Sequence, residues 1–255
     1  MMKTNFPKIS IITINFNGEK TIRETIESVL NQNYPNIEYV LIDGDSYDGS
    51  YEIIKEYEEK IDIIIREKDD GLYDALNKGI SVSTGDFIGI LHSDDIYSSK
   101  NVIKEIAEFI KANDVDCVLS NIRYMNIDGK KSLRKINALN FRPWMIRFGW
   151  MPPHLGMFLN KNVYGNYGLY LKGFKISADF EFVVRVFLLK KISYKAINLT
   201  SVIMRKGGKS TKNIRSNFII TKEMYRGCKV NNIYTNYFLL IFRIPFKLIS
   251  QFFLR

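Results

Sequence analysis

The chain has 255 residues, 46% of them hydrophobic, which is enough to bury one large core. Its net charge of +10 comes from residues 201–255, which hold eleven Lys or Arg and one acid (11 − 1 = +10). The first 200 residues are therefore neutral overall, which argues against a nucleic-acid-binding body. A basic terminal segment fits contact with an anionic membrane surface, or solvated charge without a partner.

The cysteines and the N-terminus predict a cytosolic protein. Cys117 and Cys228 lie far apart without a nearby histidine cluster, which excludes a disulfide framework and a zinc-type spacing. The first apolar run, Ile9 to Ile14, has six residues, which is too short for the core of a signal peptide.

Short apolar runs alternate with amphipathic stretches through the first half of the chain. The expected elements are strand 9–14, helix 21–31, strand 37–42, helix 50–60, strand 61–65, helix 73–82, strand 87–91, helix 101–111 and strand 117–120. The strand runs are continuously apolar, which is typical of strands buried on both faces. We therefore predict an α/β fold with an open, mostly parallel sheet flanked by helices.

The pattern weakens after residue 121, where we expect loops and an antiparallel strand pair before about residue 150. An apolar stripe predicts a helix over 178–189. Two more helices are expected after residue 217, the last over 237–254 but interrupted by Arg243, Pro245 and Lys247. Its uncharged stretch is shorter than the about 20 apolar residues that span a bilayer, so a position in the membrane interface is favoured.

Polar residues follow each of the first four strands. They are Asn15, Asn17 and Gly18, then residues 43–46, 68–71 and 92–95. Each group alone is typical of a turn or helix cap, but ligands bind at the carboxyl ends of parallel strands, so four groups together favour a site. Neither the dinucleotide-binding nor the P-loop glycine pattern is present. Adjacent Asp94 and Asp95 could instead bind Mg²⁺ or Mn²⁺, and through it a diphosphate.

Four segments carry a resemblance to a known family. Residues 9–15, 41–50, 70–79 and 84–95 closely resemble the family 2 glycosyltransferases of the GT-A fold, including bacterial polysaccharide and O-antigen enzymes. The resemblance is strong over 6–120 and weaker to about 210. It implies a GT-A domain over 1–210, with a nucleotide-sugar half (about 1–120) and an acceptor half (about 121–210). A basic, aromatic-rich helical tail, 211–255, follows as a C-terminal extension.

The resemblance also implies roles for individual residues of the donor site. The nucleotide-binding residues would be Thr13, Asn15, Asp43, Ser46, Lys68, Asp69, Asn77 and Asp94. Asp95, together with Asp94, would hold Mn²⁺ or Mg²⁺. The family's metal motif often begins with Asp or Asn two residues before Asp94, a position that His92 occupies here.

The acceptor side of the reaction needs a base, because inverting transfer removes a proton from the acceptor hydroxyl. Residues 177–185 resemble the family's acidic motif at the head of a helix, which makes Asp179 the candidate catalytic base and Glu181 the second candidate. The alternative is that Asp179 only caps the helix. Residues of lesser rank for the acceptor or diphosphate are His154, Glu181, Arg205, Lys209 and Ser210.

The expected activity is inverting transfer of a hexose, with UDP-glucose or UDP-galactose as donor and a β-linkage as product. The expected acceptor is an undecaprenyl-diphosphate-linked sugar at the inner face of the plasma membrane, in cell-surface polysaccharide or O-antigen synthesis. The alternatives are a non-catalytic sugar-nucleotide-binding module, a transferase with a non-lipid acceptor, and a nucleic-acid-binding protein, which the acidic strand ends disfavour. The tail could serve as a dimer contact as readily as a membrane anchor.

Overall fold

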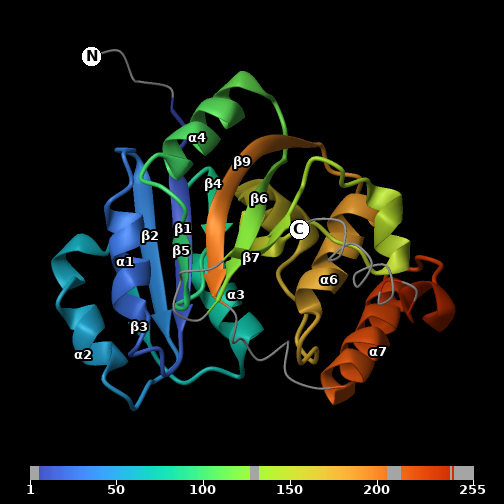
Figure 1. Cartoon of the computed structure of the whole chain (residues 1–255), viewed down its shortest axis with the longest axis horizontal. Coiled ribbons are helices and arrows are strands. Elements are labelled where there is room, and N and C mark those ends of the chain that lie inside the picture. The colour runs from blue at the N-terminus through green and yellow to red at the C-terminus, as the bar shows by residue number, and fades with distance from the viewer. Residues whose placement is uncertain (1–5, 127–131, 206–213, 242, 244–255) are drawn as a thin grey trace.

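The computed structural model describes residues 6–126, 132–205, 214–241 and 243 (Figure 1). One sheet crosses the described chain in the order β3-β2-β1-β4-β8-β6-β9-β5, with β7 also paired to β6. Its strands are β1 (Ile9–Asn15), β2 (Ile37–Asp43), β3 (Ile63–Arg66), β4 (Phe87–Ile90), β5 (Asp95–Tyr97), β6 (Cys117–Met125), β7 (Ser132–Ile136), β8 (Met157–Asn160) and β9 (Tyr194–Arg205).

Helices flank this sheet. They are α1 (Ile22–Leu30), α2 (Ser50–Lys55), α3 (Leu72–Val82), α4 (Val102–Ala112), α5 (Lys161–Tyr167), α6 (Ala178–Val183) and α7 (Ile214–Val230). Shorter turns are the 3₁₀ helices η1 (Glu58–Lys60), η2 (Pro143–Phe148) and η3 (His154–Gly156), and the π-helix η4 (Val184–Leu189). Figure 1 shows α1 and α2 at one end of the sheet and α6 and α7 at the other.

The first half is the parallel sheet that the sequence predicts. β1 pairs in parallel with β2 and β4, and β2 pairs in parallel with β3. Every residue of β1 is buried, in agreement with its continuous apolar run. Helix α3 packs on β1 and β2, and α1 packs on α2; right-handed crossovers, the rule for parallel strands, put α1 and α2 on the face opposite α3. The carboxyl ends of these strands therefore lie along one edge.

The second half departs from the parallel pattern. β8 is antiparallel to both β4 and β6, β9 is parallel to β6, and β5 is antiparallel to β9. The sheet is therefore mixed beyond β4. The predicted antiparallel pair is β6 with β7, and β6 continues to Met125, past the predicted end at residue 120. Register shifts interrupt the pairing of β6 with β7 and with β9, which blurs the apolar periodicity.

The predicted helix over 178–189 forms, but in two parts, because α6 passes into the π-helical turn η4. Helix α7 packs directly against α6: a Cβ placed on Gly227 would lie 3.2 Å from Glu181 Cα. Cys228 and Met224 are buried at this contact. Residues 237–241 are helical, and the remainder of the predicted 237–254 helix, apart from residue 243, lies outside the described residues. Within the described parts of the chain, no helix has the length and hydropathy to cross a bilayer.

Candidate active site

The ends of β1 and β2 are joined by a buried polar network. The Asn15 amide donates to Asp43 Oδ1 at 2.7 Å and to Ser46 Oγ at 3.2 Å. Ser46 donates to Asp43 through its hydroxyl (2.7 Å) and its backbone N–H (3.0 Å). Asp43 is fully buried. The structure thus brings together three of the predicted nucleotide-binding residues.

The side chains of Thr13 and Asn77 do not line the predicted nucleotide pocket but bond to other parts of the protein. Thr13 is fully buried and its hydroxyl accepts a hydrogen bond from the Tyr39 hydroxyl at 3.2 Å, so it supports the site from within the core. The Asn77 amide donates to Tyr170 O at 2.9 Å and accepts from Tyr170 N at 3.0 Å. Both polar atoms of Asn77 are used in joining α3 to the second half of the chain.

Asp69 approaches the end of β2 closely. A Cβ on Gly44 would lie 2.4 Å from Asp69 Oδ2, so only glycine leaves room for this carboxylate. Asp69 also accepts from the Gly71 N–H at 2.8 Å. Lys68 is exposed beside it.

Two exposed aromatic residues flank this network and were not among the sequence candidates. Phe16 follows Asn15 directly, and Tyr47 follows Ser46. Their side chains are 52% and 83% exposed, and their rings meet edge to face with centroids 6.0 Å apart. The sequence feature that could have identified them is an aromatic residue directly after Asn15 and directly after Ser46. Exposed rings beside a buried carboxylate can stack on a heterocyclic base.

His92, Asp94 and Asp95 form a group that could hold a metal ion. One ligand atom from each lies within 4.8 Å of the others. Asp95 is 1% exposed, and burial, with the charge of Asp94, raises its pKa well above the usual value. Among the residues that the structure describes, His92 Nε2 and Asp95 Oδ2 are buried without a hydrogen-bond partner. A divalent cation would satisfy both atoms, so the residues present fit Mn²⁺ or Mg²⁺.

Asp179 lies at the first turn of α6, beside His154. Its Oδ1 accepts from the Phe180 N–H at 2.8 Å and from the Tyr73 hydroxyl at 3.1 Å. Burial raises the pKa of Asp179 to about 6, against the lowering effect of these hydrogen bonds. The side chain remains 21% exposed, so its carboxylate is both accessible and poised for proton transfer near neutral pH.

The two histidines of the chain connect the candidate base to the metal group. His154 Nδ1 lies 3.8 Å from Asp179 Oδ2, and its ring centroid lies 5.2 Å from that of His92. Burial lowers the pKa of His154 to about 4. Burial and the neighbouring His154 lower the pKa of His92 to about 3. Both imidazoles are therefore neutral at pH 7, the form in which histidine binds metal.

Glu181 is a correction to the sequence reading. Its carboxylate is 1% exposed and accepts from Arg185 Nε and Nη2 at 3.0 and 2.9 Å, and from the Asn231 amide at 2.9 Å. Arg185 also donates to three backbone carbonyls between residues 167 and 169. With its oxygens occupied in a buried network, Glu181 holds α6, α7 and the preceding loop together and is closed to an acceptor.

Arg205 lies beside the metal group but does not present a free guanidinium. Its backbone N–H donates to Asp95 Oδ1 at 3.3 Å, and its side chain pairs with Glu24 of α1. Lys209 and Ser210 lie outside the described residues.

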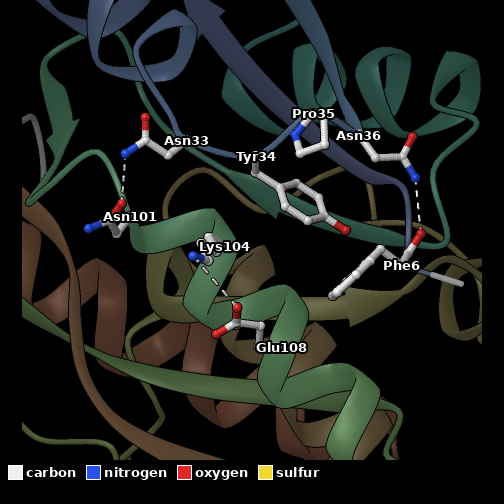
Figure 2. Close-up of a pocket in the computed structure, with 8 residues that line it drawn as sticks. All are labelled: Phe6, Asn33, Tyr34, Pro35, Asn36, Asn101, Lys104 and Glu108. Atoms are coloured by element: carbon white, nitrogen blue, oxygen red, sulfur yellow. Dashed lines mark hydrogen bonds and ion pairs between the residues drawn. The ribbon is translucent and has the colours of Figure 1, made fainter. Parts of the chain in front are cut away.

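A separate hollow of about 620 Å³ lies at the opposite edge of the sheet (Figure 2). Its lining consists of Phe6, Asn33, Tyr34, Pro35, Asn36, Asn101, Lys104 and Glu108. Phe6 precedes β1, and Asn36 precedes β2, so these are amino-terminal strand ends. The candidate site at the carboxyl ends is thus distinct from this hollow.

A polar network at the carboxyl strand ends, an acidic group that could hold a metal ion and a carboxylate at the head of a helix form the arrangement expected of a GT-A glycosyltransferase. The chain belongs to glycosyl transferase family 2, whose sequence model matches residues 10–174. An uncharacterized glycosyltransferase of Mycobacterium tuberculosis is 30% identical over 187 residues, which cover 73% of this chain and 71% of that protein. The putative teichuronic acid biosynthesis glycosyltransferase TuaG of Bacillus subtilis is 30% identical over 135 residues, 52% of this chain and 53% of TuaG.

Solved structures share the fold. Staphylococcus aureus TarS in complex with UDP-GlcNAc superposes with a TM-score of 0.69 at 18% identity, covering 91% of this chain and 70% of that one. The mannosyltransferase PcManGT of Pyrobaculum calidifontis, in complex with GDP-Man and Mn²⁺, gives a TM-score of 0.64 at 14% identity, covering 89% and 64%. The superpositions show the GT-A fold, and the family match identifies the protein as a glycosyltransferase.

Proposed function

We propose that the protein transfers a hexose with inversion, from a UDP-sugar to a lipid-diphosphate-linked sugar, in the synthesis of a cell-surface polysaccharide. The observation that carries the proposal is the placement of Asp179 opposite the His92, Asp94 and Asp95 group, with His154 between them. The UDP complex of TarS and the name of TuaG support the donor and the pathway class. UDP-glucose and UDP-galactose are the first donors to test.

The donor nucleotide would bind over the ends of β1 and β2. Asp43 is fully buried and bonded to Asn15 and Ser46, so it would reach the base only if one of these hydrogen bonds opens. Phe16 and Tyr47 offer exposed aromatic faces for stacking. Asp69 and Lys68 lie next along this edge and would contact the ribose or sugar. The hydrogen bonds among Asn15, Asp43 and Ser46 hold these side chains in place before the nucleotide binds.

The diphosphate would lie at Asp94, Asp95 and His92. A divalent cation held there would supply Lewis-acid stabilisation of the departing diphosphate. Mn²⁺ is favoured over Mg²⁺ because one of the three candidate ligands is an imidazole nitrogen.

Asp179 would act as the general base. Its carboxylate takes the proton of the acceptor hydroxyl while the acceptor oxygen bonds to the sugar's anomeric carbon on the face opposite the breaking bond to phosphate. Inversion at that carbon follows from this geometry. A pKa of about 6 leaves Asp179 mostly ionised at pH 7 while keeping it basic enough to accept a proton.

The C-terminal segment is the proposed site of contact with an anionic inner-membrane surface that carries the lipid-linked acceptor. Exposed side chains of the helical segments include Phe218 (73%) and Phe238 (76%), and Lys222, Arg226 and Lys229 are exposed on α7. Aromatic and basic groups together are typical of proteins that lie at a membrane interface. Sedimentation with phosphatidylglycerol vesicles, but not with phosphatidylcholine vesicles, would support this location. Self-association without vesicle binding would instead assign the surface to a dimer contact.

The test of the proposed function is acceptor-dependent release of UDP from a panel of UDP-sugars, with and without Mn²⁺. A synthetic sugar-diphosphate-lipid and a soluble glycoside serve as alternative acceptors. Release from one donor should be lost in both Asp95→Ala and Asp179→Asn, whereas only Asp95→Ala should lose Mn²⁺-dependent UDP binding. Tight UDP binding without transfer to any acceptor would favour a binding module and contradict the proposed activity.

A further inference from the structure

The segment that precedes Asp179 is held by a residue from the C-terminal helix. Glu223 of α7 is buried, and its carboxylate accepts three successive backbone N–H groups. The donors are Lys175 N at 2.7 Å, Ile176 N at 2.9 Å and Ser177 N at 2.9 Å. Glu223 is the one acidic residue of the sequence after position 200, in a stretch with eleven Lys or Arg. This buried acid therefore has a specific structural role, which is to bind three backbone N–H groups.

This carboxylate replaces a cap that the helix itself lacks. Helix α6 begins at Ala178, and the Ser177 side chain makes no capping hydrogen bond. The N–H groups just before a helix need acceptors when they are buried. Glu223 supplies them from another helix, and its negative charge also faces the positive end of the α6 dipole. The orientation of the first turn of α6 therefore depends on α7.

A second attachment reaches the same segment from the donor half. The Tyr73 hydroxyl of α3 lies within hydrogen-bond distance of both Ile176 O and Asp179 Oδ1. A phenol has one proton, so it donates to one acceptor at a time. The segment at the start of α6 is thus fixed by Glu223 on its N–H groups and by Tyr73, which donates either to the Ile176 carbonyl or to the Asp179 carboxylate.

We propose that Glu223 is a positioning residue for the reaction: through residues 175–177 it sets the place of the Asp179 carboxylate opposite the metal group. Tyr73 completes this clamp. Helix α7 accordingly supports the geometry of the active site, and it contributes to turnover as well as to the proposed membrane contact. The inference rests on the proposed role of Asp179 as the base.

Glu223→Gln is the first test, because it keeps the shape of the side chain and removes one acceptor oxygen. Glu38→Gln is the matched control: Glu38 is also a buried carboxylate with several hydrogen-bond donors, but it lies on β2 against Lys8, Ser10 and Thr84. Both variants lose a buried carboxylate, and only one of them contacts the segment before Asp179. Tyr73→Phe tests the other attachment.

Amide hydrogen exchange gives a readout that needs no activity. The Phe180 N–H donates to Asp179 Oδ1, so its protection reports the position of that carboxylate. We expect Glu223→Gln to accelerate exchange about tenfold or more at residues 175–177 and at Phe180. Glu38→Gln, compared under conditions of equal global stability, should leave those amides unchanged. Unchanged protection at Phe180 in Glu223→Gln would overturn the proposal.

Kinetics then separate positioning from folding. Glu223→Gln should lower kcat about 10- to 100-fold with little change in the KM for the donor, because a displaced base affects the chemical step and not nucleotide binding. Glu223→Asp, which keeps the charge, should recover part of the loss. Unchanged kcat despite faster Phe180 exchange would also overturn the proposal. If the native protein transfers no sugar from any donor, the proposed function fails, and the exchange result still decides whether Glu223 positions Asp179.

Discussion

The donor half and the acceptor half of this protein hold their site residues in different ways. In the donor half, Asn15, Asp43 and Ser46 sit at adjacent strand ends and bond to one another. In the acceptor half, Asp179 is held by α3 on one side and, through its preceding loop, by α7 on the other. The first arrangement follows from the order of a parallel sheet. The second depends on helices distant in sequence, so substitutions in the two halves should have different consequences.

The largest expected effect is in the acceptor half. Arg185→Met would leave the buried Glu181 carboxylate without its cation, and we expect a loss of about 3–5 kcal/mol in the free energy of unfolding. The double variant Arg185→Met with Glu181→Leu should recover much of that loss, because no unpaired charge remains. Urea unfolding of the native protein and the two variants measures this. Equal stability of the single and double variants would show that the ion pair does not organise this half.

Glu38 offers the corresponding test in the donor half. Burial alone would raise its pKa, but hydrogen bonds from Lys8, Ser10 and Thr84 outweigh this and lower the pKa to about 2. A lowered folded-state pKa stabilises the protein above the unfolded value near 4.5, and the stabilisation disappears as pH falls towards 2. We expect Glu38→Gln to cost about 2–3 kcal/mol at pH 7 and little near pH 2. A pH-independent cost, measured by urea unfolding across this range, would contradict the expectation.

Substitution of Asp179 should change the free energy of unfolding in the opposite direction to substitution of Glu38. Its folded-state pKa of about 6 lies above the ordinary aspartate value of 3.8, so the ionised carboxylate destabilises the fold, and the cost grows as pH rises from 3.8 to 6. Asp179→Asn should therefore raise the free energy of unfolding by about 1–3 kcal/mol above pH 6 and have little effect near pH 3. The same variant should lose transfer. A catalytic residue that destabilises the fold at working pH is a familiar trade between stability and activity.

The smallest expected effect on stability is at the exposed aromatic pair of the donor half. Tyr47→Ala should leave the unfolding midpoint nearly unchanged, because the side chain is 83% exposed. It should weaken UDP binding by about 1 kcal/mol or more, through loss of a stacking surface. Calorimetric titration of UDP checks this, with Tyr234→Ala, another exposed tyrosine far along the chain, as the control. Equal affinity in Tyr47→Ala would remove this residue from the nucleotide site.

The donor half was largely predictable from sequence because its signals are local. Continuous apolar runs predicted the buried strands, and the polar residues that follow them were placed at one edge by the rule for parallel sheets. Asn77 and Thr13 were the exceptions. Their positions in the sequence matched the family motif, but each side chain bonds to a partner, Tyr170 or Tyr39, that only the tertiary structure could supply.

The acceptor half was less predictable because its signals are long-range. The spacing of Asp179 and Glu181 gave no means of telling an accessible carboxylate from one buried against Arg185 and Asn231. The contact between the tilted rings of His92 and His154 joins the end of β4 to the 3₁₀ helix η3 and leaves no trace in the sequence periodicity. Glu223 differs from its surroundings in the sequence only as the one acid of a basic segment.

The packing of α7 on α6 has a consequence for enzyme engineering. A chimeric transferase can be made by replacing the acceptor half of one enzyme with that of another at chosen crossover points. Here Gly227 lies so close to the Glu181 backbone that a Cβ at this position would be 3.2 Å from Glu181 Cα and would require a local shift of the two helices, and Asn231 bonds to the Glu181 carboxylate. An enzyme that supplies the acceptor half of a chimera must therefore supply its α6 and its α7 together. Recombination that ends before residue 214 would pair two surfaces that never evolved against each other.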